Sequence, residues 1–454
     1  MSAPASSKTS PSRIHYAWIV VAVTFATSVI TAGTLGISGI LLLPLQQEFG
    51  WNASDVSSAF GIRLALFGLL GPFTATLMNR FGVRRMVTIA LSIILAGLVG
   101  TLFTTTVWEF FLFWGLLTGV GIGLTALVLS ATVATRWFVQ RRGLVTGLLS
   151  ASNATGQLIF LPALASVTQA YGWRTTIIIA CAANVFSVIL VLLFMRNHPK
   201  DVGVTAYGET EPQAEGSLAE HHPSIWSLFS IPVSVLKEAV KVPVFWVLFF
   251  TFFICGASTS GLIQTHFVPL CGDFGIVPVE AASILALMGL FDLFGTIGSG
   301  WLSDRFDNRW LLFWYYGLRG LSLVYLPFSS FTIVGLSFFA LFYGLDWLAT
   351  LPPTLVLIIQ RFGRARANVV FGWVFAGHQL GAALAAYGAG LMRTVLGTYL
   401  PAFFSSGVLC LIAALLIITV RKNPQPAERR CVATPSQTAL ARRVLPRASG
   451  SEVT

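Results

Sequence analysis

The chain has 454 residues, of which 55% are hydrophobic and only 10% are charged. A water-soluble domain carries about 25% charged residues, so this composition excludes a soluble globular protein. The net charge is +11, but the basic residues lie in short clusters between long apolar segments, which indicates membrane spans rather than a surface that binds nucleic acid.

Twelve apolar segments are long enough to cross a bilayer as helices, which takes about 20 residues each. The first directly follows a Ser- and Pro-rich stretch, Met1 to His15, and its full length favours a retained helix over a cleaved signal peptide. We therefore predict an all-α membrane protein whose spans are 17–42, 56–78, 85–105, 108–134, 143–165, 174–195, 243–268, 279–302, 310–328, 332–355, 369–392 and 398–420.

The basic residues predict the orientation of these spans. All but four of the 28 Lys and Arg residues fall in the tails or in connections on the same side as the tails. The positive-inside rule then places both termini in the cytoplasm, in a cytoplasmic (inner or plasma) membrane. The four exceptions are Arg63, Arg174, Arg319 and Arg393.

The longest connection between spans is polar and divides the chain into two six-helix bundles. Its acidic residues and a His221–His222–Pro223 turn predict a solvated linker. After it, Ile225 to Phe229 is expected to lie flat on the membrane interface. The predicted parts are an N-terminal tail (1–16), a first bundle (17–195), the linker (196–242), a second bundle (243–420) and a basic tail (421–454).

The two bundles match each other at a constant offset of 225 residues. One offset across four separate loops indicates a duplicated six-span unit, with both copies in the same orientation because six is even. Parallel repeats of this kind are a transporter architecture that binds substrate between the halves near the midplane. The matched segments are Pro44–Gly50 with Pro269–Gly275, Asn79–Arg84 with Asp304–Arg309, Arg136–Gly147 with Arg361–Gly372, and Gly172 with Gly397.

The loop Gly300-x-x-x-Asp304-Arg305-x-x-x-Arg309 resembles the cytoplasmic signature loop of the major facilitator superfamily. The resemblance covers nearly the whole chain and implies the major facilitator fold, with loop charges that hold one conformation closed. It therefore makes Asn79, Arg80, Asp304, Arg305 and Arg309 candidates for a cytoplasmic gate. The first copy has Asn79 where the family has Asp, and an amide accepts hydrogen bonds but forms no ion pair.

A second motif narrows the resemblance. Arg136-Trp137-Phe138, followed by Arg141-Arg142-Gly143, is similar to the monocarboxylate and oxalate/formate branch of that superfamily. The resemblance to this branch implies transport of a small carboxylate.

Motifs of enzymes and ATP-driven pumps are absent from the sequence. No Gly is followed by Lys, so there is no phosphate-binding loop, and there is no HExxH or clustered Cys/His set for a metal. The five cysteines show no CxxC spacing and are expected to pack as small apolar residues. We expect no catalytic activity, no cofactor and no metal.

Ionisable residues within the spans are the informative ones, because a charge in lipid is costly and usually functional. They are Arg63, Asp292, Arg319, Asp346 and His378. Counting about 1.5 Å per residue from the cytoplasmic helix ends places Arg319 about 14 Å, His378 about 17 Å, Asp292 about 18 Å, Asp346 about 22 Å and Arg63 about 24 Å deep. None has a charged counterpart at the 225-residue offset, so these residues are specific to one half.

Three of these residues are candidates for proton coupling or for an ion pair within the membrane. We expect Arg319 to pair with Asp292 or Asp346, or else to contact substrate. Asp292 follows Phe291 as in the family's eighth-span motif, but the arginine that binds carboxylate there is replaced by Thr296. Asp346 is a candidate proton or substrate residue.

Five polar residues are candidates for contact with substrate. Arg63 would attract an anion, unless its side chain instead reaches toward the outer membrane surface. Asn153 and Gln157 lie on one helix face at a spacing of four residues. Together with His378 and Gln379 they either contact substrate or link neighbouring helices.

Prolines within the spans predict local breaks. Pro72, Pro162 and the pair Pro352–Pro353 remove backbone N–H groups from their helices. The freed carbonyl groups either bind substrate or permit kinks.

These observations predict a secondary transporter that moves a small, monocarboxylate-like anion by proton symport or exchange. The expected partners are the substrate, protons and the lipid bilayer, and we expect a monomer that binds no nucleic acid. The alternative on the same fold is a proton-driven exporter of hydrophobic drugs. Its usual Gly-Pro pair is absent from the fifth span, which reads Ser150 to Gln157.

Overall fold

Helices dominate the described structure. The computed structural model describes residues 15–209 and 225–421, and within those ranges the only β pairing is an isolated bridge between Phe138 and Tyr207. Most of the predicted N-terminal tail, the middle of the linker with its acidic residues from Glu211 onward, and the basic tail from residue 422 lie outside the described residues.

Each of the twelve predicted spans coincides with one helix or with consecutive helices. The helices are α1 (Tyr16–Gly36), α2 (Ser38–Phe49), α3 (Ala53–Phe81), α4 (Val83–Leu102), α5 (Val107–Phe110), η1 (Phe111–Leu117), α6 (Thr118–Trp137), α7 (Arg142–Tyr171), α8 (Trp173–Phe194), η2 (Pro199–Val202), α9 (Ile225–Ala239), α10 (Pro243–Gly256), η3 (Ala257–Ile263), α11 (Gln264–Asp273), α12 (Pro278–Ser303), α13 (Asn308–Tyr325), η4 (Leu326–Phe328), α14 (Ile333–Asp346), α15 (Leu351–Phe362), α16 (Arg364–Leu396) and α17 (Leu400–Ile418).

Ten of the predicted spans are long and apolar enough within the described residues to cross a membrane. The other two are the fifth, α7, and the ninth, α13. That these two helices also cross the membrane remains a prediction, as does the cytoplasmic position of both termini.

Four spans are interrupted: the first, fourth, seventh and tenth. The first breaks at Ile37, between α1 and α2. The fourth and seventh contain the π-helices η1 and η3, a helix type that is rare and frequent at functional sites. The tenth breaks between α14 and α15, ahead of Pro352 and Pro353. These interruptions place departures from regular α-helix inside the helix bundles.

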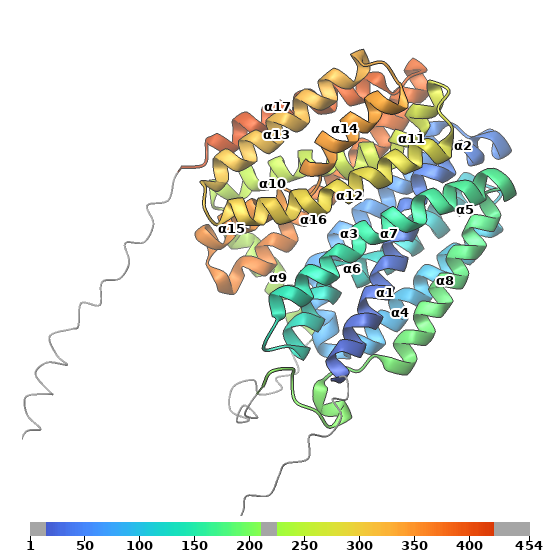
Figure 1. Ribbon diagram of the computed structural model, residues 1–454. Helices are drawn as coiled ribbons and strands as arrows, with labels where there is room; N and C mark the ends of the chain where they lie inside the picture. The colour runs from blue at the N-terminus through green and yellow to red at the C-terminus, as the bar shows by residue number, and fades with distance from the viewer. Residues whose placement is uncertain (1–14, 210–224, 422–454) are drawn as a thin grey trace, which may run out of the picture. The chain divides into compact units, whose positions relative to one another are not determined.

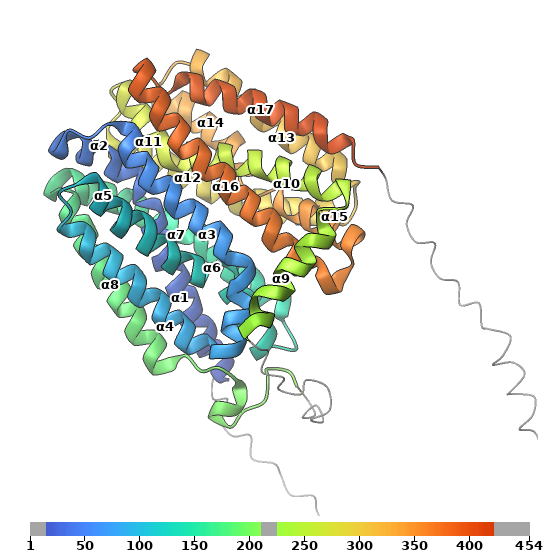
Figure 2. The same ribbon diagram turned by 180° about the vertical axis from the view of Figure 1, so that it is seen from behind.

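Two groups of helices, α1–α8 and α10–α17, lie side by side (Figures 1 and 2). Three pairs of helices join them: α3 with α16, α7 with α12, and α2 with α11. The second and eleventh spans, α3 and α16, make the most extensive of these contacts. Residues on these two helices therefore lie at or beside the seam between the groups.

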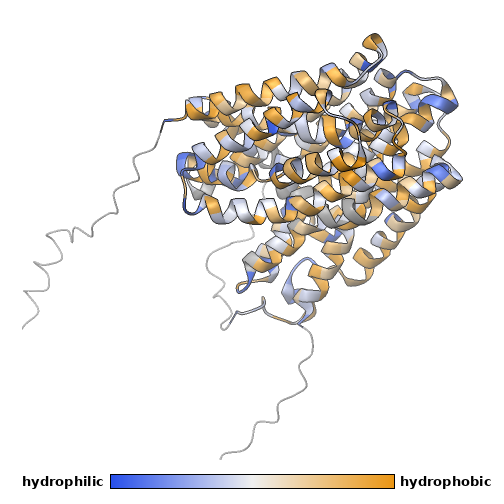
Figure 3. Ribbon diagram, turned by 45° about the horizontal axis from the view of Figure 1, so that its top comes forward, coloured by the Kyte–Doolittle hydropathy of each residue, from blue (hydrophilic) through white to orange (hydrophobic). Residues whose placement is uncertain are grey.

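Hydrophobic residues predominate along the helices (Figure 3), and large apolar side chains are exposed on several of them. Ile297, Phe338 and Leu415, on three different helices, are 73%, 62% and 66% exposed. A water-soluble protein does not present such continuous apolar surface. Lipid tails satisfy these side chains, whereas the helices satisfy their own backbone groups.

The helix α9 follows the predicted linker and is longer than the expected interfacial segment, whose side chains from Ile225 to Phe229 are not described. It contacts both α3 and α16. Trp373 Nε1 of α16 donates to the carbonyl oxygen of Pro232 at 2.9 Å, and Arg366 of α16 forms an ion pair with Glu238. The last part of the predicted linker thus packs against α3 and α16, the pair of helices with the most extensive contact between the groups.

Candidate functional site

The break in the tenth span leaves backbone groups without helical partners. Pro353 has no N–H, so the carbonyl of Ala349 cannot accept the usual bond from four residues later. Ser299 of α12 replaces that donor, because its Oγ donates to the carbonyl oxygen of Ala349 at 2.5 Å. A hydroxyl from the eighth span therefore satisfies a carbonyl that proline frees.

Two charged residues satisfy other backbone groups of the same break. Arg319 Nη2 of α13 donates to the carbonyl oxygens of Asp346 and Trp347, the latter at 3.1 Å. Asp292 Oδ1 of α12 accepts a hydrogen bond from the backbone N–H of Leu348 at 2.9 Å. Buried backbone groups need such partners, so both charges support the shape of the tenth span.

Arg319 also forms a buried ion pair with Asp346. Its Nε lies 2.6 Å from Asp346 Oδ2, and the two side chains are 0% and 9% exposed. Its Nη1 donates to Cys255 Sγ of the seventh span at 2.9 Å, and Tyr343 Oη donates to the carbonyl oxygen of Ser258 at 2.9 Å. The pair therefore connects the seventh, ninth and tenth spans, while Asp346 Oδ1 has no hydrogen-bond partner.

Asp292 is buried and has only neutral hydrogen-bond partners. Thr296 Oγ1 donates to its Oδ1 at 2.9 Å, in addition to the backbone N–H of Leu348. Among the described residues, no Lys, Arg or His lies within ion-pair distance of this carboxyl. The threonine that replaces the family's arginine thus holds the carboxyl by a hydroxyl and adds no positive charge.

Arg63 of α3 lies in the interior of the first bundle and is 2% exposed. Its Nη2 donates to the carbonyl oxygen of Leu35 at 2.9 Å and to Ser38 Oγ, on either side of the break in the first span. Its guanidinium lies 5.1 Å from the ring centre of Trp114 in the π-helix of the fourth span. No Asp or Glu of the described chain pairs with it, and its Nε has no partner.

His378 and Gln379 lie on α16 and are 4% and 3% exposed. The ring of His378 packs between Phe252 and Phe375, with ring centres 4.9 and 5.7 Å away. Gln379 packs against α3, where a Cβ on Gly68 would lie 2.4 Å from the Cβ of Gln379. His378 Nδ1 and Gln379 Oε1 have no hydrogen-bond partner. Gln379 faces the seam, whereas His378 faces α10 within its own bundle.

The side chains of the other two predicted substrate residues, Asn153 and Gln157, lie outside the described structure. Their helix, α7, contacts α12 across the seam. Their role in binding substrate stays a prediction.

In the first copy of the predicted cytoplasmic gate, the amide serves as an acceptor. Asn79 Oδ1 accepts a hydrogen bond from Arg136 Nη2 of α6 at 2.5 Å. Arg80 lies over the ring of Phe81, 5.5 Å from its centre. The hydrogen bond between Asn79 and Arg136 therefore links the ends of the second and fourth spans without an ion pair.

The second copy of the gate is arranged differently. Arg309 pairs with Asp307 at 2.7 Å, a residue that the motif does not include. Arg305 lies over the ring of Trp301, 4.0 Å from its centre. Asp304 is exposed and forms no ion pair with any other described residue. Within the described part of the chain, these charges make no contact across the seam.

Two polar residues of the interior were missed by the sequence reasoning. His266 lies within the seventh predicted span and is ionisable, so its signal in the sequence is the same as that of His378. Its Nε2 lies 2.8 Å from the carbonyl oxygen of Ala386 on α16. Ser299 could not be identified from the sequence, because serine is common in membrane spans. Only the structure shows that it reaches the carbonyl group of Ala349.

Comparisons with known proteins agree with this architecture. The family model described as Major Facilitator Superfamily matches residues 23–386 and 272–449. Monocarboxylate transporter 13 of Rattus norvegicus is 27% identical over 91% of this chain and 91% of its own length. An uncharacterised MFS-type transporter of Bacillus subtilis, YcxA, is 25% identical over 84% of this chain and 90% of its own length.

Solved structures share the fold at low sequence identity. A bacterial homologue of the human lysosomal transporter Spinster, inward-facing and occupied, has a TM-score of 0.71 and 16% identity, and the match covers 90% of this chain and 97% of that one. A D-xylose–proton symporter has a TM-score of 0.67 and 16% identity, over 89% and 98% of the two chains. The predicted all-helical major facilitator fold is confirmed by these matches.

Proposed function

Because the chain belongs to the Major Facilitator Superfamily and is a multi-pass membrane transporter, we propose that it carries a small organic anion by alternating access, together with a proton. Arg63 is the observation that carries this proposal. A buried guanidinium without a carboxylate partner is costly in a membrane, and a substrate anion is the counter-ion that would offset that cost. The relatives named as monocarboxylate transporters support the same substrate class.

We assign proton coupling to Asp292 rather than to Asp346. Asp346 is neutralised by Arg319, whereas Asp292 is held only by neutral donors. A carboxyl with neutral partners in a low-dielectric site binds and releases a proton more readily than one in an ion pair. His378, whose Nδ1 has no partner, is retained as a second candidate for proton transfer, with Gln379, Asn153 and Gln157 as substrate contacts.

The topology completes the proposal. All twelve helices, including α7 and α13, cross the cytoplasmic membrane of a monomeric chain as two parallel bundles joined by the linker, with both termini in the cytoplasm. The contact between Asn79 and Arg136 and the loop with Asp304, Arg305 and Arg309 then lie at the cytoplasmic face. There they would help to close one conformation of the transport cycle.

Uptake by the purified protein in liposomes tests the substrate and the proton separately. We expect a radiolabelled monocarboxylate to accumulate when the outside is acidic. The variant Arg63→Gln should lower that uptake by at least tenfold, whereas Arg174→Gln, a half-exposed arginine paired with Glu48, should leave it unchanged. Asp292→Asn should abolish accumulation driven by the pH gradient while exchange of labelled for unlabelled substrate continues.

Two results would overturn parts of the proposal. Saturable uptake that is identical in wild type and Arg63→Gln would exclude Arg63 as the residue that binds the anion. Proton-driven movement of a hydrophobic cation, with no response to a panel of mono- and dicarboxylates, would favour the drug exporter instead.

A further inference from the structure

Helix α9 lies at one end of the seam, beside the ends of α3 and α16 (Figure 2). We call this the linker end of the seam. Apolar residues at helical spacing form a stripe along α9 that is buried or half-buried: Pro232, Val235, Leu236 and Ala239. Lys237 and Glu238, on the other side of the helix, are exposed. One face of α9 is therefore packed onto the two groups of helices.

Two side chains of α16 hold α9 in this position. Trp373 Nε1 donates to the carbonyl oxygen of Pro232 at 2.9 Å, and Arg366 forms an ion pair with Glu238. The ring of Trp373 also packs edge-on against Phe73 of α3, with ring centres 5.8 Å apart. Trp373 therefore joins α9, the second group of helices and the first group at one point.

At the opposite end of the seam, the two groups are in close contact. The backbone N–H of Ser54 on α3 donates to Thr394 Oγ1 on α16 at 3.2 Å. A Cβ on Gly390 of α16 would lie only 2.5 Å from Ser57 Oγ of α3. This end of the seam is therefore closed, and Ser57 is fully buried in it.

The same two helices are less tightly packed toward the linker end. A Cβ on Gly372 of α16 would lie 3.5 Å from the nearest atom of Pro72 on α3, which is an ordinary van der Waals distance. Here α9 packs against both helices. Any movement of one linker end relative to the other would therefore change the surface on which α9 is docked.

This geometry gives α9 a preference between conformations. A transporter of this family works by moving its two bundles relative to each other. An element that makes contacts in only one arrangement of the bundles shifts the population toward that arrangement. The docked α9 has its contacts with α3 and α16 while the opposite end of the seam is closed.

We propose that α9 is a strap that stabilises the conformation in which the opposite end of the seam is closed. Opening that end requires α9 to give up contacts with α3 or α16. The hydrogen bond from Trp373 and the ion pair of Glu238 with Arg366 then determine how often it opens. The inference concerns the populations of two conformations, so it does not depend on which substrate is transported.

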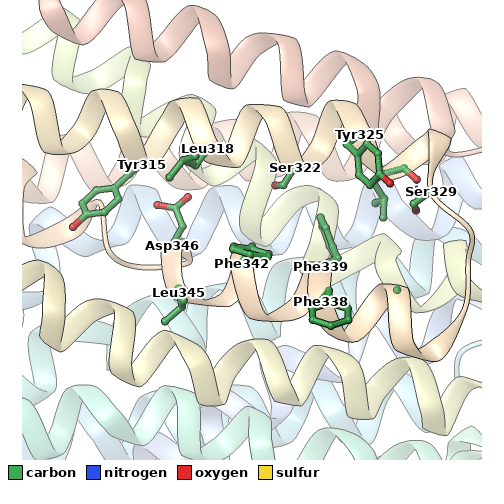
Figure 4. Close-up of a pocket in the computed structure, with 12 residues that line it drawn as sticks. Tyr315, Leu318, Ser322, Tyr325, Ser329, Phe338, Phe339, Phe342, Leu345 and Asp346 are labelled. Carbon is green, nitrogen blue, oxygen red and sulfur yellow. Dashed lines mark hydrogen bonds between the residues drawn. The ribbon is translucent and has the colours of Figure 1, made fainter.

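A cysteine in place of Ser57 measures the opening directly. Ser57 is 0% exposed, so Ser57→Cys reacts with a water-soluble fluorescein maleimide only when the opposite end of the seam opens. The full-length protein is labelled in lipid nanodiscs, and the chain without Ser57→Cys gives the labelling of the native cysteines. The control reporter is Ser322→Cys, because Ser322 lies in the groove between α13 and α14, within the second bundle (Figure 4).

Variants of the strap are then compared by the labelling rate of Ser57→Cys. Glu238→Arg places like charges together and should raise the rate at least threefold. Glu238→Arg combined with Arg366→Glu restores an ion pair of reversed sense and should return the rate to its original value. Trp373→Phe, which removes only the donor to α9, should raise the rate at least twofold. The control is Lys237→Glu, a charge reversal at the neighbouring exposed position, which should leave the rate unchanged.

Three results would each overturn the proposal. A labelling rate that neither Glu238→Arg nor Trp373→Phe changes would show that α9 does not influence the opening. A charge-swapped pair that is labelled as fast as Glu238→Arg would show that the ion pair is not the contact that acts. An equal rise at Ser322→Cys would show that α9 supports the fold as a whole and not one conformation of it.

Discussion

Replacing Arg319 by Met tests whether this buried arginine holds the tenth span together. The substitution leaves Asp346 as an unpaired charge with a side chain that is 9% exposed. Removing one partner of a buried ion pair costs about 3–5 kcal/mol, because the remaining charge has no counter-ion. It also removes the donor to the carbonyl groups at the end of α14.

The double variant Arg319→Met, Asp346→Leu separates the charge from the backbone contacts. It removes the unpaired carboxylate and leaves only the two carbonyl groups without a donor. Hydrogen bonds inside membrane proteins average about 0.6 kcal/mol, with the largest near 1.7 kcal/mol, so the double variant should cost about 1–3 kcal/mol. We therefore expect it to be about 2 kcal/mol more stable than Arg319→Met alone.

Unfolding in mixed micelles with increasing fractions of sodium dodecyl sulfate measures these free energies, followed by the fluorescence of the 13 tryptophans. The control is Arg366→Met, which removes an ion pair whose side chains are 57% and 58% exposed. Such a surface pair contributes about 0–1 kcal/mol. The reasoning is refuted if the double variant is as unstable as Arg319→Met, or if Arg366→Met is destabilised as much.

Two further substitutions test packing and the gate in the same unfolding assay. Gly295→Ala should destabilise the protein by about 1–3 kcal/mol, because the added Cβ would lie 1.9 Å from the carbonyl oxygen of Leu345 and the backbone would have to move. The control is Gly298→Ala, whose added Cβ would meet nothing within 4 Å. Equal losses of stability in the two variants would contradict the prediction. Asn79→Asp should stabilise the protein by about 1 kcal/mol, since it gives Arg136 a charged acceptor in place of an amide. A free energy of unfolding no higher than that of Asn79→Ala would rule out a stabilising contact with Arg136.

The positions of the helices followed from the sequence because apolar length and turn residues are local signals. The duplication is visible even in the backbone. Gly50 and Gly275 have φ of 68° and 80°, and Gly172 and Gly397 have φ of 83° and 72°. Both pairs are related by the 225-residue offset, and each member directly follows the end of a helix or lies two residues after it, in a conformation that glycine adopts without steric cost.

The sequence narrowed the partner of the buried Arg319 to Asp292 or Asp346 but could not choose between them. Counting along the helices placed Arg319 about 14 Å and Asp346 about 22 Å from the cytoplasmic ends, at 1.5 Å per residue. The structure places Arg319 Nε and Asp346 Oδ2 2.6 Å apart. The count treated the tenth span as one straight, upright helix, whereas it is broken between α14 and α15.

The breaks themselves were only partly predictable. Pro352 and Pro353 indicated the interruption in the tenth span. The breaks predicted at Pro72 and Pro162 are absent, because α3 and α7 continue through these prolines, and no proline marks the π-helices η1 and η3. Which group would satisfy each freed carbonyl was also open, because the donors come from other spans. Ser299, for example, lies 50 residues from Ala349.

In each bundle an arginine supports the breaks in the helices, and the difference between the two arginines supports the proposed anion site at Arg63. In each bundle a buried arginine bridges the two interrupted spans: Arg63 contacts Leu35 of the first and Trp114 of the fourth, and Arg319 contacts Cys255 of the seventh and Asp346 of the tenth. The repeat offset does not relate these arginines, because one lies on the second helix of its bundle and the other on the third. Both arginines donate to backbone carbonyl groups at the breaks, so this structural role is common to Arg63 and Arg319. Only Arg319 has a carboxylate, however, and an arginine that served the backbone alone would gain from one in the same way. Within the described residues Arg63 has no carboxylate partner; structural support leaves this unexplained, and the proposed anionic substrate would account for it.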